Sequence, residues 1–240
     1  MQSLAPEKPN LVYFGSLAGS HQYVRLYRVV RAYVPQGAAV LDWGAGNGHF
    51  SFFLVHSGYR ATGYSLFPQE FQEWLRDPDY QLVVGDPSDP VRLPFADESY
   101  DAVVSAGVLE HVRETGGEET ASLREISRVL RPGGVFIAYH FPNRYSWIDV
   151  LARGLPAEFH HTYRYTRDDI ERLVKAADLE LVEAGSYALL PRNPLYRLPD
   201  RLANSERFAR AYDATDGMLG ALLPGLCTNH YFVARRPVGQ

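Results

Sequence analysis

The sequence is poor in cysteine and has no long apolar run. Cys227 is the one cysteine among 240 residues, which excludes an internal disulfide framework and a metal site made of cysteines alone. No stretch of about 18 uninterrupted apolar residues occurs, so we expect no membrane span. The first nine residues lack the basic start and apolar run of a signal peptide. These absences predict a cytoplasmic protein.

An excess of positive charge is also missing. The 24 lysines and arginines are outnumbered by 28 aspartates and glutamates, which gives a formal net charge of −4. No global positive field would attract nucleic acid, so we expect no nucleic-acid partner. Hydrophobic residues make up 46% of the chain and charged residues 22%, which is the profile of a globular protein. A length of 240 residues favours one domain with insertions over two full domains.

Short apolar runs alternate with amphipathic stretches, which is the pattern of βα units around a parallel sheet. Strands are predicted at 39–43, 60–64, 81–84, 100–105, 135–140, 179–187 and 229–234. Helices are predicted at 20–34, 49–56 and 119–130, and from a capping Thr166 to about residue 177. The segments 141–165 and 191–227 fall outside this alternation, and the second is long enough to contain helix. Both are candidate lids, because open α/β sheets bind ligands beyond the carboxyl ends of their strands.

A glycine-rich loop follows the first predicted strand. Gly44, Gly46 and Gly48 are spaced by single residues, and Asp42 comes just before them. Such a loop could bind a nicotinamide or flavin dinucleotide or S-adenosylmethionine (SAM), or could be only a tight turn. A dinucleotide fingerprint has its third glycine one residue later, next to a pyrophosphate. Because SAM carries a sulfonium and an ammonium, an aspartate beside the loop favours SAM.

Four motifs together resemble the class I SAM-dependent methyltransferases of the small-molecule type, over residues 20–188. They are VLDWGAGNG at 40–48, VGDP at 84–87 with LPFADESYD at 93–101, VLEHV at 108–112 and LRPGG at 130–134. The fold that this resemblance implies is α/β, with a seven-stranded, mostly parallel Rossmann-like sheet. Helices would cover both faces, and the last strand would be antiparallel. The cofactor would be SAM.

The resemblance also implies roles for particular residues. Gly44, Ala45 and Gly46 would line the methionine part of SAM beside Asp42, and the backbone of Ser105 and Ala106 would hold the same end. Asp86 would accept a hydrogen bond from the adenine amino group, and Pro87 would flank the ring. The alternative for Asp86 is a purely turn-forming role, since Gly-Asp-Pro favours turns.

The chain departs from its relatives at two positions. Most relatives end the second strand with an acidic residue that binds both ribose hydroxyls, but Ser65 stands there in this chain. A serine cannot bridge two hydroxyls as a carboxylate does, so Tyr64 or Glu70 would have to compensate. The alternative is a SAM-binding protein without turnover. Some relatives also bind a divalent ion through Glu-x-x-Glu-His, but Gly107 replaces the first carboxylate, which predicts a metal-independent enzyme.

Methyl transfer to a hydroxyl also needs a base, and histidine titrates nearest to working pH. His140 ends the fifth predicted strand, and His161 lies in the first insertion; these two are the favoured bases. His111 is a third candidate, although it could equally pack within its motif. Arg144, Tyr145 and Arg164 are predicted to contact the acceptor.

The acceptor is expected to be a small molecule such as a sugar, glycolipid precursor or secondary metabolite, methylated on oxygen or on nitrogen. A nicotinamide-dependent oxidoreductase is a less favoured alternative. The arginine-rich, apolar segment 191–227 leaves open a homodimer interface or a peripheral contact with a lipid-borne substrate.

Overall fold

A seven-stranded sheet forms the centre of the computed structural model, which describes residues 15–67, 75, 80–152 and 161–239. The strands are β1 (Ala39–Trp43), β2 (Arg60–Ser65), β3 (Gln81–Val84), β4 (Tyr100–Ala106), β5 (Leu130–Pro142), β6 (Glu180–Tyr187) and β7 (Asn229–Arg235). Their order is β3-β2-β1-β4-β5-β7-β6. The first five strands pair in parallel, and β7 lies antiparallel between β5 and β6. The predicted fold class and its antiparallel last strand are therefore confirmed.

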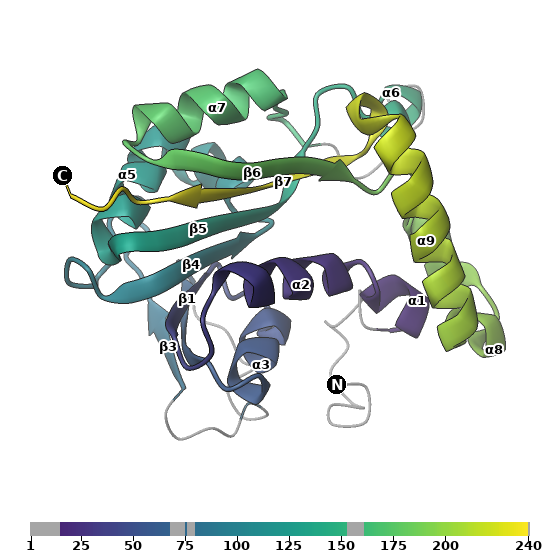
Figure 1. The fold of residues 1–240 in the computed structure, drawn as a ribbon, viewed down its shortest axis with the longest axis horizontal. Coiled ribbons are helices and arrows are strands. Elements are labelled where there is room, and N and C mark those ends of the chain that lie inside the picture. The colour runs from purple at the N-terminus through teal and green to yellow at the C-terminus, as the bar shows by residue number, and fades with distance from the viewer. Residues whose placement is uncertain (1–14, 68–74, 76–79, 153–160, 240) are drawn as a thin grey trace.

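Helices cover both faces of this sheet (Figure 1). α2 (Tyr23–Tyr33) and α3 (His49–His56) lie on one face, and α5 (Glu119–Val129) and α7 (Arg167–Ala176) lie on the other. Each face buries its own apolar cluster, because the parallel strands are covered on both sides. A capping box at Thr166 and Asp169 opens α7, as the sequence predicts.

One strand begins earlier than predicted. The sequence predicts that Leu130 ends a helix and that residues 131–134 stop it before the strand, but Leu130 to Gly134 form the start of β5. Leu130 pairs with Tyr100, and the backbone groups of Gly133 and Gly134 bond to Arg236 beyond the end of β7. Pairing partners on both sides thus extend the strand through residues whose local preference is for a turn.

Both predicted insertions lie at the edge of the sheet where the parallel strands end (Figure 1). The first contains α6 (Trp147–Ala152), while residues 153–160 are outside the described ranges. The second contains η3 (Asn193–Arg197), α8 (Asp200–Ala203), α9 (Glu206–Leu222) and η4 (Pro224–Leu226), which confirms the predicted helix. In the described ranges, no helix has both the length and the apolar character needed to cross a bilayer.

The N-terminal helix α1 (Leu17–Ser20) packs against α9 at the same edge. His21 Nδ1 lies 2.6 Å from Asp213 Oδ2, and Arg192 Nη2 lies 2.8 Å from Asp213 Oδ1. Segments from the two ends of the described chain therefore cover this edge together.

A buried carboxylate links the first insertion to the helices beside it. Glu119, at the start of α5, is fully buried and accepts a hydrogen bond from Arg113 Nε at 2.7 Å. The hydroxyl of Tyr165 donates to the other oxygen of the same carboxylate. Arg113 lies in η2 (Leu109–Thr115), so one side chain connects η2, α5 and the strand-like segment before α7.

We expect Glu119→Ala to lower the free energy of unfolding by about 1–3 kcal/mol, because the Tyr165 hydroxyl would lose its buried partner. Urea denaturation would measure the change. Arg167→Ala, which breaks an exposed pair with Glu171, is the matched control and should change stability by less than about 0.5 kcal/mol. Equal effects of the two substitutions would contradict this role of Glu119.

Candidate functional site

The glycine loop is held by the end of the neighbouring strand. The carbonyl oxygen of Tyr64 accepts hydrogen bonds from the backbone N–H groups of Gly44 and Ala45, both at 2.9 Å. Gly44 and Gly46 have φ values of 84° and 47°, in the left-handed region that favours glycine. The loop is therefore a tight turn with a fixed shape.

The two glycines meet different surroundings. A Cβ on Gly44 would lie 2.1 Å from Val108 Cγ2, so Gly44 is needed for close packing against the segment after β4. A Cβ on Gly46 would meet only the carbonyl oxygen of Gly44, at 3.7 Å. Gly46 thus leaves an open face, which fits a ligand that lies against the loop backbone.

Asp42 lies directly beneath this loop. It is 1% exposed, and its Oδ2 accepts a hydrogen bond from Ser51 Oγ at 2.5 Å. Burial raises the pKa of Asp42 to about 7, because the hydroxyl and the backbone N–H of Ser51 compensate only part of the lost hydration. A cation next to the loop would favour the ionised form, so the residues present fit the positively charged end of SAM.

The residues predicted for the ribose and adenine lie at the ends of β2 and β3. Ser65 is 7% exposed, and its Oγ accepts a hydrogen bond from the Phe67 N–H at 3.4 Å. Asp86 is exposed, and its Oδ1 accepts bonds from Ser88 N and Oγ at 2.8 and 2.7 Å. These bonds hold the pKa of Asp86 below its ordinary value. Pro87 is exposed beside it, and Glu70 is outside the described residues.

The predicted cofactor contact of the Tyr64 side chain is not supported. Alternation along β2 sends its ring to the opposite face from Ser65, and the ring packs with Phe95 in the core. The Tyr64 residue is 2% exposed, and its hydroxyl lies against Gly85. Its contribution to the site is the carbonyl that holds the glycine loop.

Ser105 and Ala106 end β4 beside the loop, where the sequence predicts them. Ser105 is 1% exposed and turned inward, with its Oγ accepting a hydrogen bond from Leu109 N at 3.3 Å. Ala106 is partly exposed. Gly107 follows with φ of 80°, and its N–H donates to the carbonyl of Tyr139. The Ser105 side chain thus supports the first residue of η2, so Ser105 can offer a ligand only its backbone groups.

His140 lies in an irregular part of β5, with a φ of 63° that is uncommon for residues other than glycine. The Tyr187 hydroxyl accepts a hydrogen bond from the His140 backbone N–H at 2.9 Å and lies 2.9 Å from His140 Nδ1. The Tyr187 hydroxyl is also bonded to the Tyr139 hydroxyl, whose own proton goes to the Gln22 carbonyl. Its single proton therefore has two acceptors, Tyr139 and His140 Nδ1, and the neutral imidazole carries its own proton on Nε2 when Tyr187 donates to Nδ1.

Burial lowers the pKa of His140 to about 3, with smaller contributions from His49, His161 and Arg192. Tyr23 of α2 packs edge-on against both His49 and His140. His140 is therefore neutral at ordinary pH and a poor proton acceptor, and in the tautomer with its proton on Nε2 it can donate a hydrogen bond from that atom.

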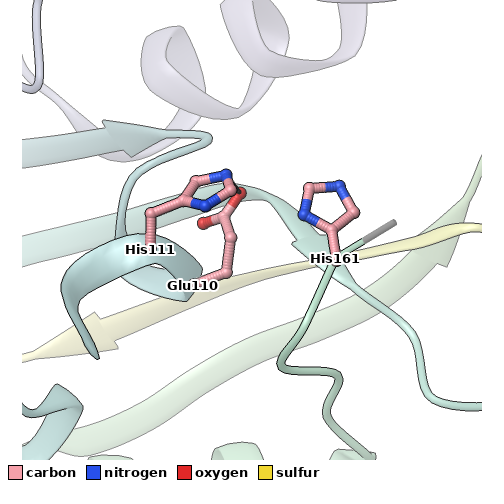
Figure 2. A group of neighbouring side chains, drawn as sticks. All are labelled: Glu110, His111 and His161. Atoms are coloured by element: carbon pink, nitrogen blue, oxygen red, sulfur yellow. Dashed lines mark ion pairs between the residues drawn. The ribbon is translucent and has the colours of Figure 1, made fainter. Parts of the chain in front are cut away.

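The other two predicted histidines lie together with a buried glutamate (Figure 2). Glu110 and His111 come from η2, and His161 faces them from the first insertion. The ligand atoms of these three side chains all lie within 4.8 Å of one another. His111 is also bonded to Glu114, with Nδ1 2.8 Å from Oε2. Burial raises the pKa of Glu110 to about 8 and lowers the pKa of His161.

Two of the three predicted acceptor contacts line a cleft of about 540 Å³. Arg144 and Arg164 lie in it with Arg113 and Arg172, while Asp169 is its acidic member. Tyr145 is 59% exposed and is not among the residues that line this cleft. The arginines give the cleft an excess of positive charge, which suits an anionic group.

Sequence reasoning missed Tyr187, which fixes the orientation of the His140 ring. The signal was weak, because Tyr187 is an ordinary apolar end to a strand. It also missed the meeting of His161 with Glu110, since nothing local to either residue records the return of the first insertion.

The pKa of Asp42 makes a stability prediction. Because the folded protein binds this proton more tightly than the unfolded chain, whose value is about 3.8, Asp42 favours folding fully below pH 4. That contribution, on the order of 4 kcal/mol at most, is lost as the pH rises through 7. Asp42→Asn should therefore gain stability over the wild type between pH 5 and pH 8.

Urea denaturation without ligand at both pH values would measure the difference. Asp89→Asn, in an exposed loop, controls for the loss of one negative charge. If the difference in unfolding free energy between Asp42→Asn and the wild type does not change with pH, the pKa of Asp42 is not raised in the folded protein.

Comparison with known proteins identifies the same region. Residues 41–138 match the family model described as a methyltransferase domain. An uncharacterised methyltransferase of Mycobacteroides abscessus is 32% identical over 145 residues, covering 55% of this chain and 50% of that protein. A demethylmenaquinone methyltransferase of Renibacterium salmoninarum is 32% identical over 133 residues, covering 50% and 51%. The chain thus spans about half the length of these curated relatives.

A solved structure extends the likeness to most of the chain. The 1,6-didemethyltoxoflavin-N1-methyltransferase of Burkholderia thailandensis, solved with 1,6-didemethyltoxoflavin and S-adenosylhomocysteine bound, aligns with a TM-score of 0.58 and 18% identity. The alignment covers 94% of this chain and 81% of that one. Such a low identity shows the fold. The match to the methyltransferase family model covers residues 41–138, which include the glycine loop, Asp86, and Glu110 and His111, and over most of its length the chain has the fold of a solved methyltransferase.

Proposed function

We propose that this protein transfers a methyl group from SAM to a hydroxyl or amine of a small molecule. The observation that carries the proposal is the buried acid of Asp42 beneath a glycine loop whose Gly46 face is open. A fully buried carboxylate is costly unless a cation or a proton accompanies it. A cationic ligand on the loop would provide that partner, and the match of residues 41–138 to a methyltransferase domain supports SAM as the ligand.

The residues that would hold SAM surround the loop. Asp42, Gly44, Ala45 and Gly46 would receive its methionine end, together with backbone groups of Ser105 and Ala106. Ser65 would contact the ribose with one hydroxyl, and Asp86 would accept from the adenine amino group through its Oδ2, with Pro87 alongside. When bound, SAM supplies an electrophilic methyl group on its sulfonium sulfur.

We propose a different role for His140 from the base that its position suggests. With its proton on Nε2 and a pKa of about 3, it would donate a hydrogen bond rather than accept a proton. Such a donor can orient an acceptor oxygen or nitrogen. Tyr187 would act through His140 as a positioning residue.

The acceptor proposal rests on the covered edge and the arginine cleft. α6 and α9 lie where the strands end, which suits a small molecule better than a large one. Arg144 and Arg164 would contact an anionic part of the acceptor. The names of two similar proteins refer to demethylmenaquinone and to 1,6-didemethyltoxoflavin.

Of the two alternative functions, the structure disfavours one, and a single observation favours the other. The antiparallel β7 and the family model argue against a nicotinamide-dependent oxidoreductase. A SAM-binding protein without turnover is favoured by one observation, the serine at the ribose position. Ser65 offers a single hydroxyl, where a carboxylate would offer two acceptor oxygens.

Turnover distinguishes the enzyme from the binding protein. Purified protein would be incubated with SAM and a panel of hydroxyl and amine acceptors, and S-adenosylhomocysteine release would be measured. We expect release with at least one acceptor, above the rate without acceptor. SAM binding without release across the whole panel would favour the protein without turnover.

The role of Asp86 makes a separate prediction. Asp86→Ala should weaken SAM binding about tenfold in calorimetry, because the adenine amino group would lose a charged acceptor. Ser88→Ala is the matched control, since it removes a turn bond to Oδ1 and keeps the carboxylate. It should change the affinity less than threefold. An equal loss in both variants would mean that Asp86 acts only through the turn.

A further inference from the structure

Glu110, His111 and His161 form a side-chain cluster that the proposed cofactor contacts do not use. We propose that these three residues bind a divalent first-row transition-metal ion. The sequence predicts a metal-independent enzyme, because no local pattern indicates that His161 joins Glu110 and His111.

The chemistry of the three donors matches such an ion. Two imidazole nitrogens and one carboxylate oxygen suit zinc, iron, cobalt or manganese, whereas magnesium prefers oxygen ligands and water. The donor atoms lie within 4.8 Å of one another, and His111 Nε2 is 3.9 Å from Glu110 Oε1. The donor atoms around one bound ion lie roughly 3 Å apart, so side-chain rotations that move these atoms by on the order of 1 Å would bring them into coordinating positions.

The orientation of His111 supports the assignment independently. Its Nδ1 is 2.8 Å from Glu114 Oε2, and a carboxylate at this distance accepts the Nδ1 proton. The lone pair of the neutral ring is then on Nε2, the atom that faces Glu110. A histidine held by a carboxylate on one nitrogen, with its other nitrogen directed at a ligand set, is the arrangement that metal sites use.

Glu110 supports it as well. The residue is 3% exposed, and within the described ranges its ion-pair partner is His111 alone. The carboxylate also receives a hydrogen bond from its own backbone N–H. A buried carboxylate without a lysine or arginine beside it calls for another positive partner, and a metal ion provides one. His111 is 35% exposed, so the cluster is open to an incoming ligand on one side.

The position of the cluster connects it with methyl transfer. Glu110 Oε1 is 3.7 Å, and His140 Cβ is 3.9 Å, from the point where a Cβ on Gly107 would lie. The cluster is therefore at the carboxyl ends of β4 and β5, next to the residues assigned to SAM. Three protein ligands leave coordination positions open, and an acceptor with two adjacent oxygen atoms could fill them.

The ion site does not depend on the proposed function. The chelating acceptor, such as a catechol or a vicinal diol, rests on that function, so the ion site and the acceptor are tested separately.

Cobalt(II) is the probe for the site, because its visible absorption reports coordination by protein ligands. Untagged full-length protein would be titrated with cobalt(II) without SAM, by absorption and calorimetry. We expect one ion per chain in the wild type and at least 100-fold weaker binding in Glu110→Gln and His161→Gln. Glu114→Gln should weaken binding 10- to 100-fold, since it only orients His111.

His56→Gln, which changes an exposed histidine on α3, is the control and should bind like the wild type. Circular dichroism and urea denaturation would show that each variant is folded. Failure of the folded wild type to bind cobalt(II), or equal binding in Glu110→Gln and the wild type, would overturn the site.

The acceptor class is tested with a matched pair of probes. Catechol should change the visible spectrum of the cobalt(II)-loaded protein, and phenol, which has a single hydroxyl, should change it much less. If the two probes behave alike, the chelating acceptor is refuted while the ion site stands. Loss of SAM binding or turnover would count against the proposed function and not against the ion site.

Discussion

Parallel pairing of β1, β4 and β5 is the constraint on which the site depends. The register aligns Trp43 with Ser105 and Ser105 with Ala138, so β1 and β4 end at the level where β5 approaches His140. Each strand then delivers a different feature to that level: the glycine loop after β1, the turn at Gly107 after β4, and His140 within β5. Residues almost a hundred positions apart become neighbours because the hydrogen-bond register between the strands fixes their positions.

The features that the sequence predicts well are local or periodic. Strand positions, the Thr166 cap and the glycine loop follow from patterns within a few residues of each other. Two features could not be predicted in this way. The start of β5 depends on partners in β4 and beyond β7, which override the turn preference of Pro132 and the glycines after it. His140 and Tyr187 belong to β5 and β6, which β7 separates in the sheet, so no local pattern records that the two residues meet.

Three histidines that look equivalent in the sequence have different chemistry in the fold. His140 is enclosed by aromatic rings and bonded to a buried hydroxyl, so it stays neutral. His111 is part of a short helix, exposed to solvent, with a carboxylate on one side. His161 is partly enclosed and close to His111. Surroundings rather than residue type decide which of them can donate a hydrogen bond, bind an ion or accept a proton.

The contact between α1 and α9 has a consequence for the order of folding. His21 and Asp213 are separated by 192 positions, and Leu17 donates its backbone N–H to Asn204. During synthesis on the ribosome, the early segment must wait for almost the whole chain before its partner exists. The sheet strands β1 to β5 can pair before then, so the covering of the binding edge is a late event. A nascent chain would therefore expose its cofactor loop to solvent well before it could enclose a second molecule.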